Sequence, residues 1–183
     1  MNLIWRSLWR MFLRRRKPIG LSPLAVSTTS FRVLPTDVDA LGHMNNGRFL
    51  SIADLGRFEL LQQAGLYGPM RMRGWYPVVV ASTISYRKSL DLWQKYDIES
   101  RFVGIDDRAV YVEQRFTVDG EIYAQMVIRG RFLKQKGGLV PMEELIEFFG
   151  VERDDVRMPE WLVRWSQDVA LPSTRDPAPS VWE

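Results

Sequence analysis

One long helix pattern, followed by strand patterns, is the feature that most constrains the fold of this sequence. From residue 47 to residue 64, apolar side chains recur along one broad side of a helix about 27 Å long. Asn45 or Asn46 supplies an N-cap in front of this helix, and Gly65 supplies a stop behind it. Because this helix is the only large apolar element, it has to cover whatever sheet the other segments form.

The strands of that sheet are marked by alternating apolar residues. A weak strand is expected at residues 31–34, after a linker at 17–30, and a loop at 65–75 follows the long helix. Four further strands are then expected as an antiparallel meander, at residues 76–90, 95–105, 108–118 and 121–134. Asp119-Gly120 is a strong hairpin signal between the last two. The order predicts an α+β fold, with a sheet of about five strands wrapped around one long central helix.

The chain divides into three segments. We expect a leader and linker at residues 1–28 and a folded domain at 29–150 that ends in a short helix near 141–149. A C-terminal segment at 151–183 should hold a helix near 159–169 and an extended tail. The sequence has no Cys and one His, which excludes disulfides, thiol nucleophiles and multi-His or Cys-ligated metal sites. We expect no metal ion and no cofactor.

Charge is unevenly distributed along the chain. The whole sequence has 25 Lys and Arg against 22 Asp and Glu, a net charge of +3, yet no acidic residue precedes Asp37. Residues 1–36 hold seven of the cations, so the remaining 18 face all 22 acids and residues 37–183 have a net charge of −4. This mildly acidic body argues against a nucleic-acid partner.

Residues 1–16, MNLIWRSLWRMFLRRR, have the pattern of a basic amphipathic helix. Arg6, Arg10 and Arg14 recur every four residues and therefore lie along one side. Arginine interrupts the apolar run, so this segment cannot span a bilayer. We expect residues 1–17 to make a peripheral contact between a cytoplasmic protein and an anionic membrane surface. A helix docked on the body and a cleaved organellar presequence are the alternatives.

The densest polar cluster, DVDALGHMNNG at residues 37–47, lies directly before the long helix. A carboxylate in this loop can act as a general base or nucleophile. Free N–H groups at Gly47 and its neighbours can bind a developing oxyanion, because the N-terminus of a helix favours negative charge. His and Asn side chains can orient water or substrate. Turn and capping chemistry explains much of the same composition, so both interpretations stay open from the residues alone.

The motif D-x-D-x-x-x-H-x-N-N and the helix RFLSIADLGR that follows resemble hotdog-fold acyl-CoA thioesterases of the hydroxybenzoyl-CoA thioesterase-like type. The later segment ISYRKSL at residues 84–90 resembles a strand of the same family, and GHMNN is also similar to plant acyl-carrier-protein thioesterases. The resemblance covers roughly residues 29–135. It implies a hotdog fold, a homodimer or dimer of dimers with active sites at the dimer interface, and metal-free hydrolysis of an acyl thioester of CoA or acyl-carrier protein in lipid metabolism.

By residue, the resemblance implies that Asp39 is the catalytic carboxylate and that His43 and Asn45 are its polar partners. It implies that Asn46 and Gly47 supply backbone N–H groups as an oxyanion hole. Asp37 matches a position that orients the loop, and Phe49 stands where many relatives have Tyr. Asp54 and Arg57 match the acidic and basic positions of the family's helix. Arg87 and Lys88 are candidate ligands of the CoA phosphates. A structural ion pair explains Asp54 and Arg57 as well as a catalytic role does. Ordinary exposed cations on a strand explain Arg87 and Lys88 as well as phosphate binding does.

The apolar residues after the helix suit an acyl pocket, although core packing is the commoner reason for them. They are Leu66, Met70, Met72 and Trp75. The alternative function is a non-catalytic acyl-CoA- or lipid-binding hotdog protein at a membrane surface. A hotdog dehydratase is disfavoured because its usual His-x-Pro-Gly-type block is missing. A Ser-His-Asp hydrolase is disfavoured because no G-x-S-x-G motif occurs.

Overall fold

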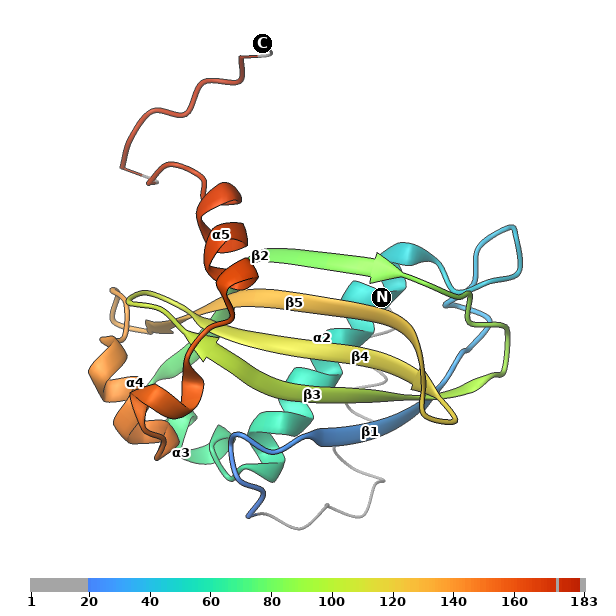
Figure 1. The fold of residues 1–183 in the computed structure, drawn as a ribbon, viewed down its shortest axis with the longest axis horizontal. Helices are drawn as coiled ribbons and strands as arrows, with labels where there is room; N and C mark the ends of the chain where they lie inside the picture. Colours follow the sequence, from blue (N-terminus) through green and yellow to red (C-terminus); the bar gives the residue numbers. More distant parts are fainter. Residues whose placement is uncertain (1–19, 174, 182–183) are drawn as a thin grey trace.

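The computed structural model describes residues 20–173 and 175–181. Figure 1 shows a five-stranded antiparallel sheet with the long helix α2 (Asn46–Gln63) behind it and the short helix α5 (Glu160–Asp168) in front. The predicted α+β fold class and the predicted central helix are confirmed. The predicted leader helix at residues 1–17 lies outside the described residues, and no helix within them is long and apolar enough to cross a membrane.

The strand order in the sheet is β1-β3-β4-β5-β2. The strands are β1 (Ser27–Arg32), β2 (Trp75–Tyr86), β3 (Lys95–Ile105), β4 (Val110–Val118) and β5 (Glu121–Lys134). The predicted four-strand meander is therefore wrong: β3, β4 and β5 follow one another, but β2 pairs with β5 at the far edge. Alternation assigns side chains to the faces of a strand and carries no information about which strand lies beside it.

The hairpin between β4 and β5 has the predicted turn. Asp119 and Gly120 both have positive φ, at 50° and 82°. Two successive positive φ values define a type I′ turn, whose twist matches that of the two strands. Local turn chemistry therefore determines how these two strands connect.

Helix α2 packs against the inner face of the sheet, and the main core lies between them. Phe49 and Ile52 are buried, and the Phe49 ring lies 4.9 Å from Phe116 of β4. Gly56 allows this close approach, because a Cβ atom there would lie only 2.8 Å from Gln114 Nε2 and 2.9 Å from Ile98. The helix therefore touches the sheet at mid-length.

Some elements differ from the expected ones. The first strand covers Ser27–Arg32 instead of residues 31–34, because the alternating burial of polar Ser and Thr gives no hydrophobic signal. The expected loop at 65–75 contains a short helix, α3 (Tyr67–Met72). Helix α4 (Met142–Phe149) is present within one residue of its predicted limits and ends at the left-handed Gly150. A 3-10 turn, η1 (Arg153–Val156), precedes α5.

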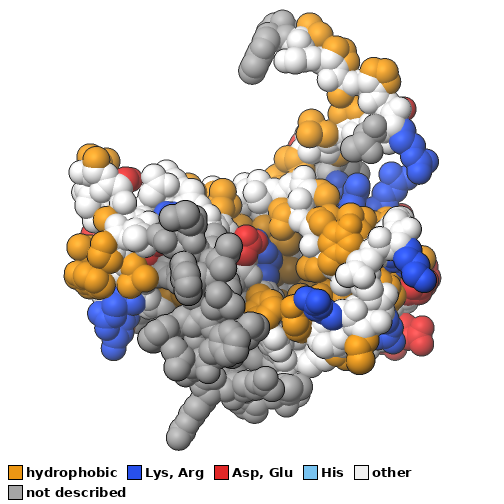
Figure 2. Space-filling view, turned by 180° about the vertical axis from the view of Figure 1, so that it is seen from behind, with side chains coloured by type: hydrophobic (Ala, Val, Ile, Leu, Met, Phe, Trp, Pro, Cys, Tyr) orange, Lys and Arg blue, Asp and Glu red, His pale blue; other side chains and the backbone are white. Residues whose placement is uncertain are grey.

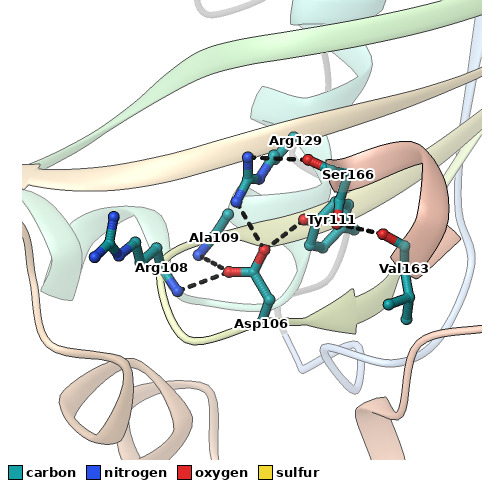
Figure 3. Close-up of polar contacts among 7 residues, drawn as sticks. All are labelled: Asp106, Arg108, Ala109, Tyr111, Arg129, Val163 and Ser166. Atoms are coloured by element: carbon teal, nitrogen blue, oxygen red, sulfur yellow. Dashed lines mark hydrogen bonds and ion pairs between the residues drawn. The ribbon is translucent and has the colours of Figure 1, made fainter. Parts of the chain in front are cut away.

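The outer face of the sheet carries a polar cluster covered by α5 (Figure 3). Asp106 accepts hydrogen bonds from the Tyr111 hydroxyl at 2.5 Å and from Arg129 Nη2 at 3.0 Å. Arg129 also donates to the Ser166 carbonyl of α5 at 3.5 Å. Buried Leu162 of α5 packs beside this cluster. These contacts attach the C-terminal segment to the side of the sheet opposite α2.

Candidate active site

Asp37 anchors the polar loop in front of α2. Its side chain is fully buried, and Oδ2 accepts a hydrogen bond from the Leu34 N–H at 2.9 Å. Its Oδ1 accepts from Arg48 Nη2 at 2.9 Å, and its carbonyl accepts from the Asn45 N–H at 2.9 Å. Asp37 thus holds the beginning of the loop against the start of the helix, which is the arrangement expected of a residue that orients the loop.

Asp39 lies on the exposed part of this loop. Its Oδ1 accepts a hydrogen bond from the Leu41 N–H at 2.9 Å, and its carbonyl accepts from Gly42 N–H at 3.0 Å. Gly42 has a φ of 82°, which closes the turn and favours glycine. Asp39 is exposed, and among the residues that the structure describes its carboxylate has no ion-pair partner.

His43 faces a residue that lies far away in the sequence. Its Nε2 atom lies 3.6 Å from Asp91 Oδ1, in the loop after β2, and both side chains are exposed. The Met44 N–H donates to the Leu90 carbonyl at 2.8 Å and holds the two loops together. No local sequence signal marks Asp91. Within residues 20–173 and 175–181, no three His, Asp or Glu side chains gather as metal ligands.

The start of α2 is capped by Asn45. Its Oδ1 accepts a hydrogen bond from the Gly47 N–H at 2.9 Å, so that N–H already has an acceptor in this structure. The Asn46 carbonyl accepts from the Tyr86 hydroxyl at 3.1 Å, and burial raises the pKa of Tyr86. The Tyr86 ring also packs edge-on against Phe49 at 5.2 Å. Tyr86, at the end of β2, therefore lies beside the helix start.

Arg87 and Lys88 lie at the same end of the sheet as the polar loop, directly after β2 (Figure 1). Both donate to Glu121, Arg87 Nη1 at 2.8 Å and Lys88 Nζ at 2.6 Å. The hydrogen bonds from Lys88 and Arg87 lower the pKa of Glu121. The two cations are thus exposed but partly neutralised by this carboxylate.

A cavity of about 260 Å³ lies between α2 and the inner face of the sheet. Figure 2 shows hydrophobic side chains gathered around a hollow on the helix side of the molecule. Its lining residues come from two helices and four strands: Asp54, Arg57, Phe58, Leu60, Leu61, Tyr67, Met70, Pro77, Val78, Val79, Phe102, Val110, Val112, Ile128, Gly130 and Phe132. Of the four apolar residues expected to line a pocket, Met70 does so, whereas Met72 is exposed and Leu66 and Trp75 are buried elsewhere.

The two charged residues of the cavity wall bind each other. Arg57 forms an ion pair with Asp54, and its Nη1 donates to Gln114 Oε1 at 2.5 Å. Gln114 is fully buried, and its Nε2 donates to the Ala53 carbonyl at 3.0 Å and to Ser100 Oγ at 2.8 Å. Burial lowers the pKa of Arg57, while the Asp54 carboxylate opposes that shift. The sequence pattern contained Asp54 and Arg57 but gave no sign of Gln114.

The polar loop and the cavity lie at different positions along α2. Asp54 follows Asn46 by eight residues, which corresponds to about 12 Å along the helix axis. On β2, the cavity is lined by residues 77–79, whereas Tyr86 at the other end contacts the helix start. The structure therefore groups Asp39, His43, Asn45, Asn46 and Gly47 in one loop, with Arg87 and Lys88 at the same end of the sheet, and leaves the cavity separate.

Comparisons with known proteins agree with this architecture. Residues 33–166 match the model of the thioesterase-like superfamily. Protein THEM6 of Xenopus laevis is 39% identical over 117 residues, which are 64% of this chain and 56% of that protein. Protein THEM6 of Drosophila melanogaster is 30% identical over 167 residues, 91% of this chain and 82% of that protein. The chain spans just over half the length of the frog protein.

A solved structure shares the fold. The probable thioesterase YbaW of Escherichia coli superimposes with a TM-score of 0.62 at 23% sequence identity, covering 66% of this chain and 94% of that one. The structural likeness supports the hotdog arrangement of sheet and helix, and the family model covers most of the sequence. On this evidence, the chain belongs to the thioesterase-like superfamily.

Proposed function

We propose that this chain hydrolyses an acyl thioester of CoA or acyl-carrier protein, with Asp39 as the catalytic carboxylate. The observation that carries the proposal is the position of Asp39. It is an exposed carboxylate in a loop that buried Asp37 anchors, directly before the N-terminus of an 18-residue helix. Membership of the thioesterase-like superfamily supports the reaction class.

The reaction requires proton transfer and stabilisation of one oxyanion. As a general base, Asp39 takes a proton from water while the water oxygen bonds to the thioester carbonyl carbon. The tetrahedral intermediate then collapses, the C–S bond breaks, and the thiolate takes the proton from Asp39, which yields a carboxylic acid and a free thiol. As a nucleophile, the Asp39 carboxylate would instead attack the carbonyl carbon and expel the thiolate as the C–S bond breaks, forming an acyl anhydride. Water then hydrolyses the anhydride to the carboxylic acid and the Asp39 carboxylate, and the proton released goes to the thiolate.

Backbone N–H groups at Asn46 and Gly47 are the proposed oxyanion donors. The positive end of the helix dipole favours negative charge at this place. Because the Gly47 N–H donates to Asn45 Oδ1 without substrate, it has to exchange this acceptor for the carbonyl oxygen. Asn45 would then be free to contact the substrate, in line with its expected role as a polar partner.

We further propose that the working unit is a homodimer formed through the free edge of β2. Val79 and Val80 are exposed on this long edge strand, whose one pairing partner within residues 20–173 and 175–181 is β5. Pairing β2 with its own copy about a two-fold axis sets the start of one strand against the end of the other. Residues 77–79 line the cavity and Tyr86 contacts the helix start, so this pairing brings the Asp39 loop of each subunit toward the cavity of the other.

The proposed role of Arg87 and Lys88 is to bind the CoA phosphates at the end of the sheet that carries the Asp39 loop. Phosphate oxygens would replace or share the contacts of Glu121 with the two cations. Because these side chains are exposed, salt weakens such binding.

Asp39→Asn tests the catalytic role, because the amide keeps the size of the side chain but cannot take a proton. We expect turnover of a panel of acyl-CoA substrates to fall at least 10²-fold, as is typical for loss of a general base. The comparison variant is Asp54→Asn, which removes the carboxylate that pairs with Arg57 in the cavity wall and should lower turnover less than Asp39→Asn does. Full activity of Asp39→Asn would contradict the role of Asp39. Greater loss in Asp54→Asn would transfer the catalytic role to Asp54. Acyl-CoA binding without turnover in the wild type would favour the non-catalytic alternative.

A further inference from the structure

Gly130 accounts for the space between α2 and the sheet. It lies on the inner face of β5, where Met126, Ile128 and Phe132 fill the core with large side chains. A Cβ at Gly130 would meet only ordinary contacts, at 3.4 Å from Ile128 Cδ1 and 3.6 Å from the Val78 carbonyl. Close packing therefore does not require glycine here, in contrast to Gly56. A glycine inside a strand marks a bulge or a place where a ligand or backbone approaches closely. The β2 bulge between Val79 and Ala81 lies opposite Gly130, and Gly130 also lines the cavity, so the missing side chain leaves this part of the cavity open.

The inner end of the cavity is closed by two phenyl rings. Phe102 of β3 and Phe132 of β5 both line the cavity and are buried. Each packs against Phe149 of α4, with ring centroids 5.1 Å and 5.6 Å apart. Because Phe149 is itself buried, both rings pack against other buried side chains and have little room to move aside.

The outer end of the cavity opens toward β2. The Asp54 side chain is 64% exposed and Val79 is 48% exposed, whereas Leu60 and Phe132 at greater depth are buried. A ligand therefore enters between α2 and β2 and points its far end at the phenyl wall.

The lining selects for an uncharged, apolar ligand. Arg57 forms an ion pair with Asp54 and donates a hydrogen bond to Gln114, so the two charged side chains of the wall already have partners and do not call for a charged ligand. A hydroxyl or carboxylate at the far end of a ligand would meet only hydrocarbon, and an unpaired buried polar group is costly. With roughly 30 Å³ for each water-sized group, a cavity of about 260 Å³ holds about nine such groups.

We infer that this cavity receives an acyl chain of about eight to ten carbons without polar substituents, with Gly130 providing space and Phe102 and Phe132 setting the limit of chain length. The inference rests on the proposed function for the identity of the ligand as an acyl group. The thioester then lies at the mouth beside β2, where the proposed dimer brings the second subunit's loop.

The test is a binding experiment that needs no turnover. Isothermal titration of the full chain with non-hydrolysable S-alkyl-CoA thioethers, from butyl to hexadecyl, gives affinity as a function of chain length. We expect binding to tighten about fourfold for each added methylene up to octyl or decyl, and hexadecyl to bind at least tenfold more weakly than decyl. Equal affinity for decyl and hexadecyl would overturn the inference.

Two variants should move the chain-length optimum in opposite directions. Gly130→Val fills the cavity with a residue that suits a strand, so the optimum should shift to shorter chains. Phe132→Ala opens the inner wall, so hexadecyl should gain affinity relative to octyl. Gly68→Ala, at an open position in α3, is the matched control and should leave the optimum unchanged. If Phe132→Ala does not fold, Gly130→Val decides alone, and an unchanged optimum in that variant overturns the inference.

The same samples separate this inference from the proposed hydrolysis. Chain-selective binding of the thioethers without turnover of acyl-CoA would support the cavity assignment and contradict the proposed function. Turnover that depends on Asp39 but shows no preference for chain length would support the hydrolysis and overturn the cavity assignment.

Discussion

At Asp106, burial and hydrogen bonding act on the pKa in opposite directions. Burial raises the pKa of this carboxyl, but hydrogen bonds from Tyr111 and the Arg108 N–H, together with the charge of Arg129, lower it by more. The folded-state pKa is therefore below the unfolded one. The stabilisation from this group is complete above the unfolded pKa and is lost as the pH falls through the folded value.

Tyr111 is the partner whose removal tests this cluster. Burial, and then the hydrogen bond to Asp106, raise the pKa of Tyr111 to about 12, so its hydroxyl is protonated and donates at neutral pH. Tyr111→Phe should lower the free energy of unfolding by about 1.5–3 kcal/mol at neutral pH, because the bond has a charged acceptor. Urea unfolding at neutral and acidic pH measures this loss, which should shrink once Asp106 is protonated.

The control for this prediction is Tyr76→Phe. Tyr76 is exposed on β2, so removing its hydroxyl should change the free energy of unfolding by less than about 0.5 kcal/mol. Equal losses in the two variants, or a loss in Tyr111→Phe that is the same at both pH values, would contradict the assigned role of the cluster.

Among the elements, α5 contacts the outer face of the sheet through one buried stripe. Leu162 is fully buried against Tyr111 and Val127, whereas Trp161 on the same helix is exposed. Upstream, a Cβ at Gly104 of β3 would lie 2.3 Å from Met158 Cγ, so glycine there admits the segment that leads into α5. The helix is held by a small cluster separate from the main core.

Leu162→Ala tests how α5 is attached. A buried Leu replaced by Ala typically costs about 2–5 kcal/mol, so chemical denaturation should show a clear loss of stability. The same change at Leu171, which is exposed in the tail, should be nearly neutral. Hydrogen exchange should rise in residues 160–168 while β4 stays protected. Equal exchange in α5 of wild type and Leu162→Ala would show that this contact does not hold the helix.

At the scale of the whole molecule, the proposed dimer makes the edge strand β2 the place where a second subunit would pair. Val80 stands at the bulge where the pairing of β2 with β5 shifts, and its side chain is exposed. Lysine on an edge strand disfavours edge-to-edge pairing. Val80→Lys should therefore convert a dimer to a monomer in sedimentation velocity, and thioesterase turnover should fall with it.

Val26→Lys is the control for the dimer prediction. Val26 is similarly exposed but lies at the β1 edge of the sheet, so the same charge there should leave sedimentation and turnover unchanged. A monomeric wild type with full turnover would contradict the need for a second subunit.

The sequence by itself determined the features that depend on neighbours along the chain. The periodicity of apolar residues located α2, the Asp119-Gly120 pair located the hairpin, and the DVDALGHMNNG block located the polar loop before the helix. Such features follow from backbone preferences, local capping and side-chain alternation, all of which act within a few residues.

Only the tertiary structure decided the features that join distant residues. It put β2 at the edge beside β5, set Asp91 against His43, and placed Gln114 under Arg57. It also brought Gly130, Phe102 and Phe132 together as lining residues of one cavity. Strand order and cavity shape result from the packing of all elements around α2. The periodicity of one segment reports which side chains share a face, and it does not report which other segment packs against that face.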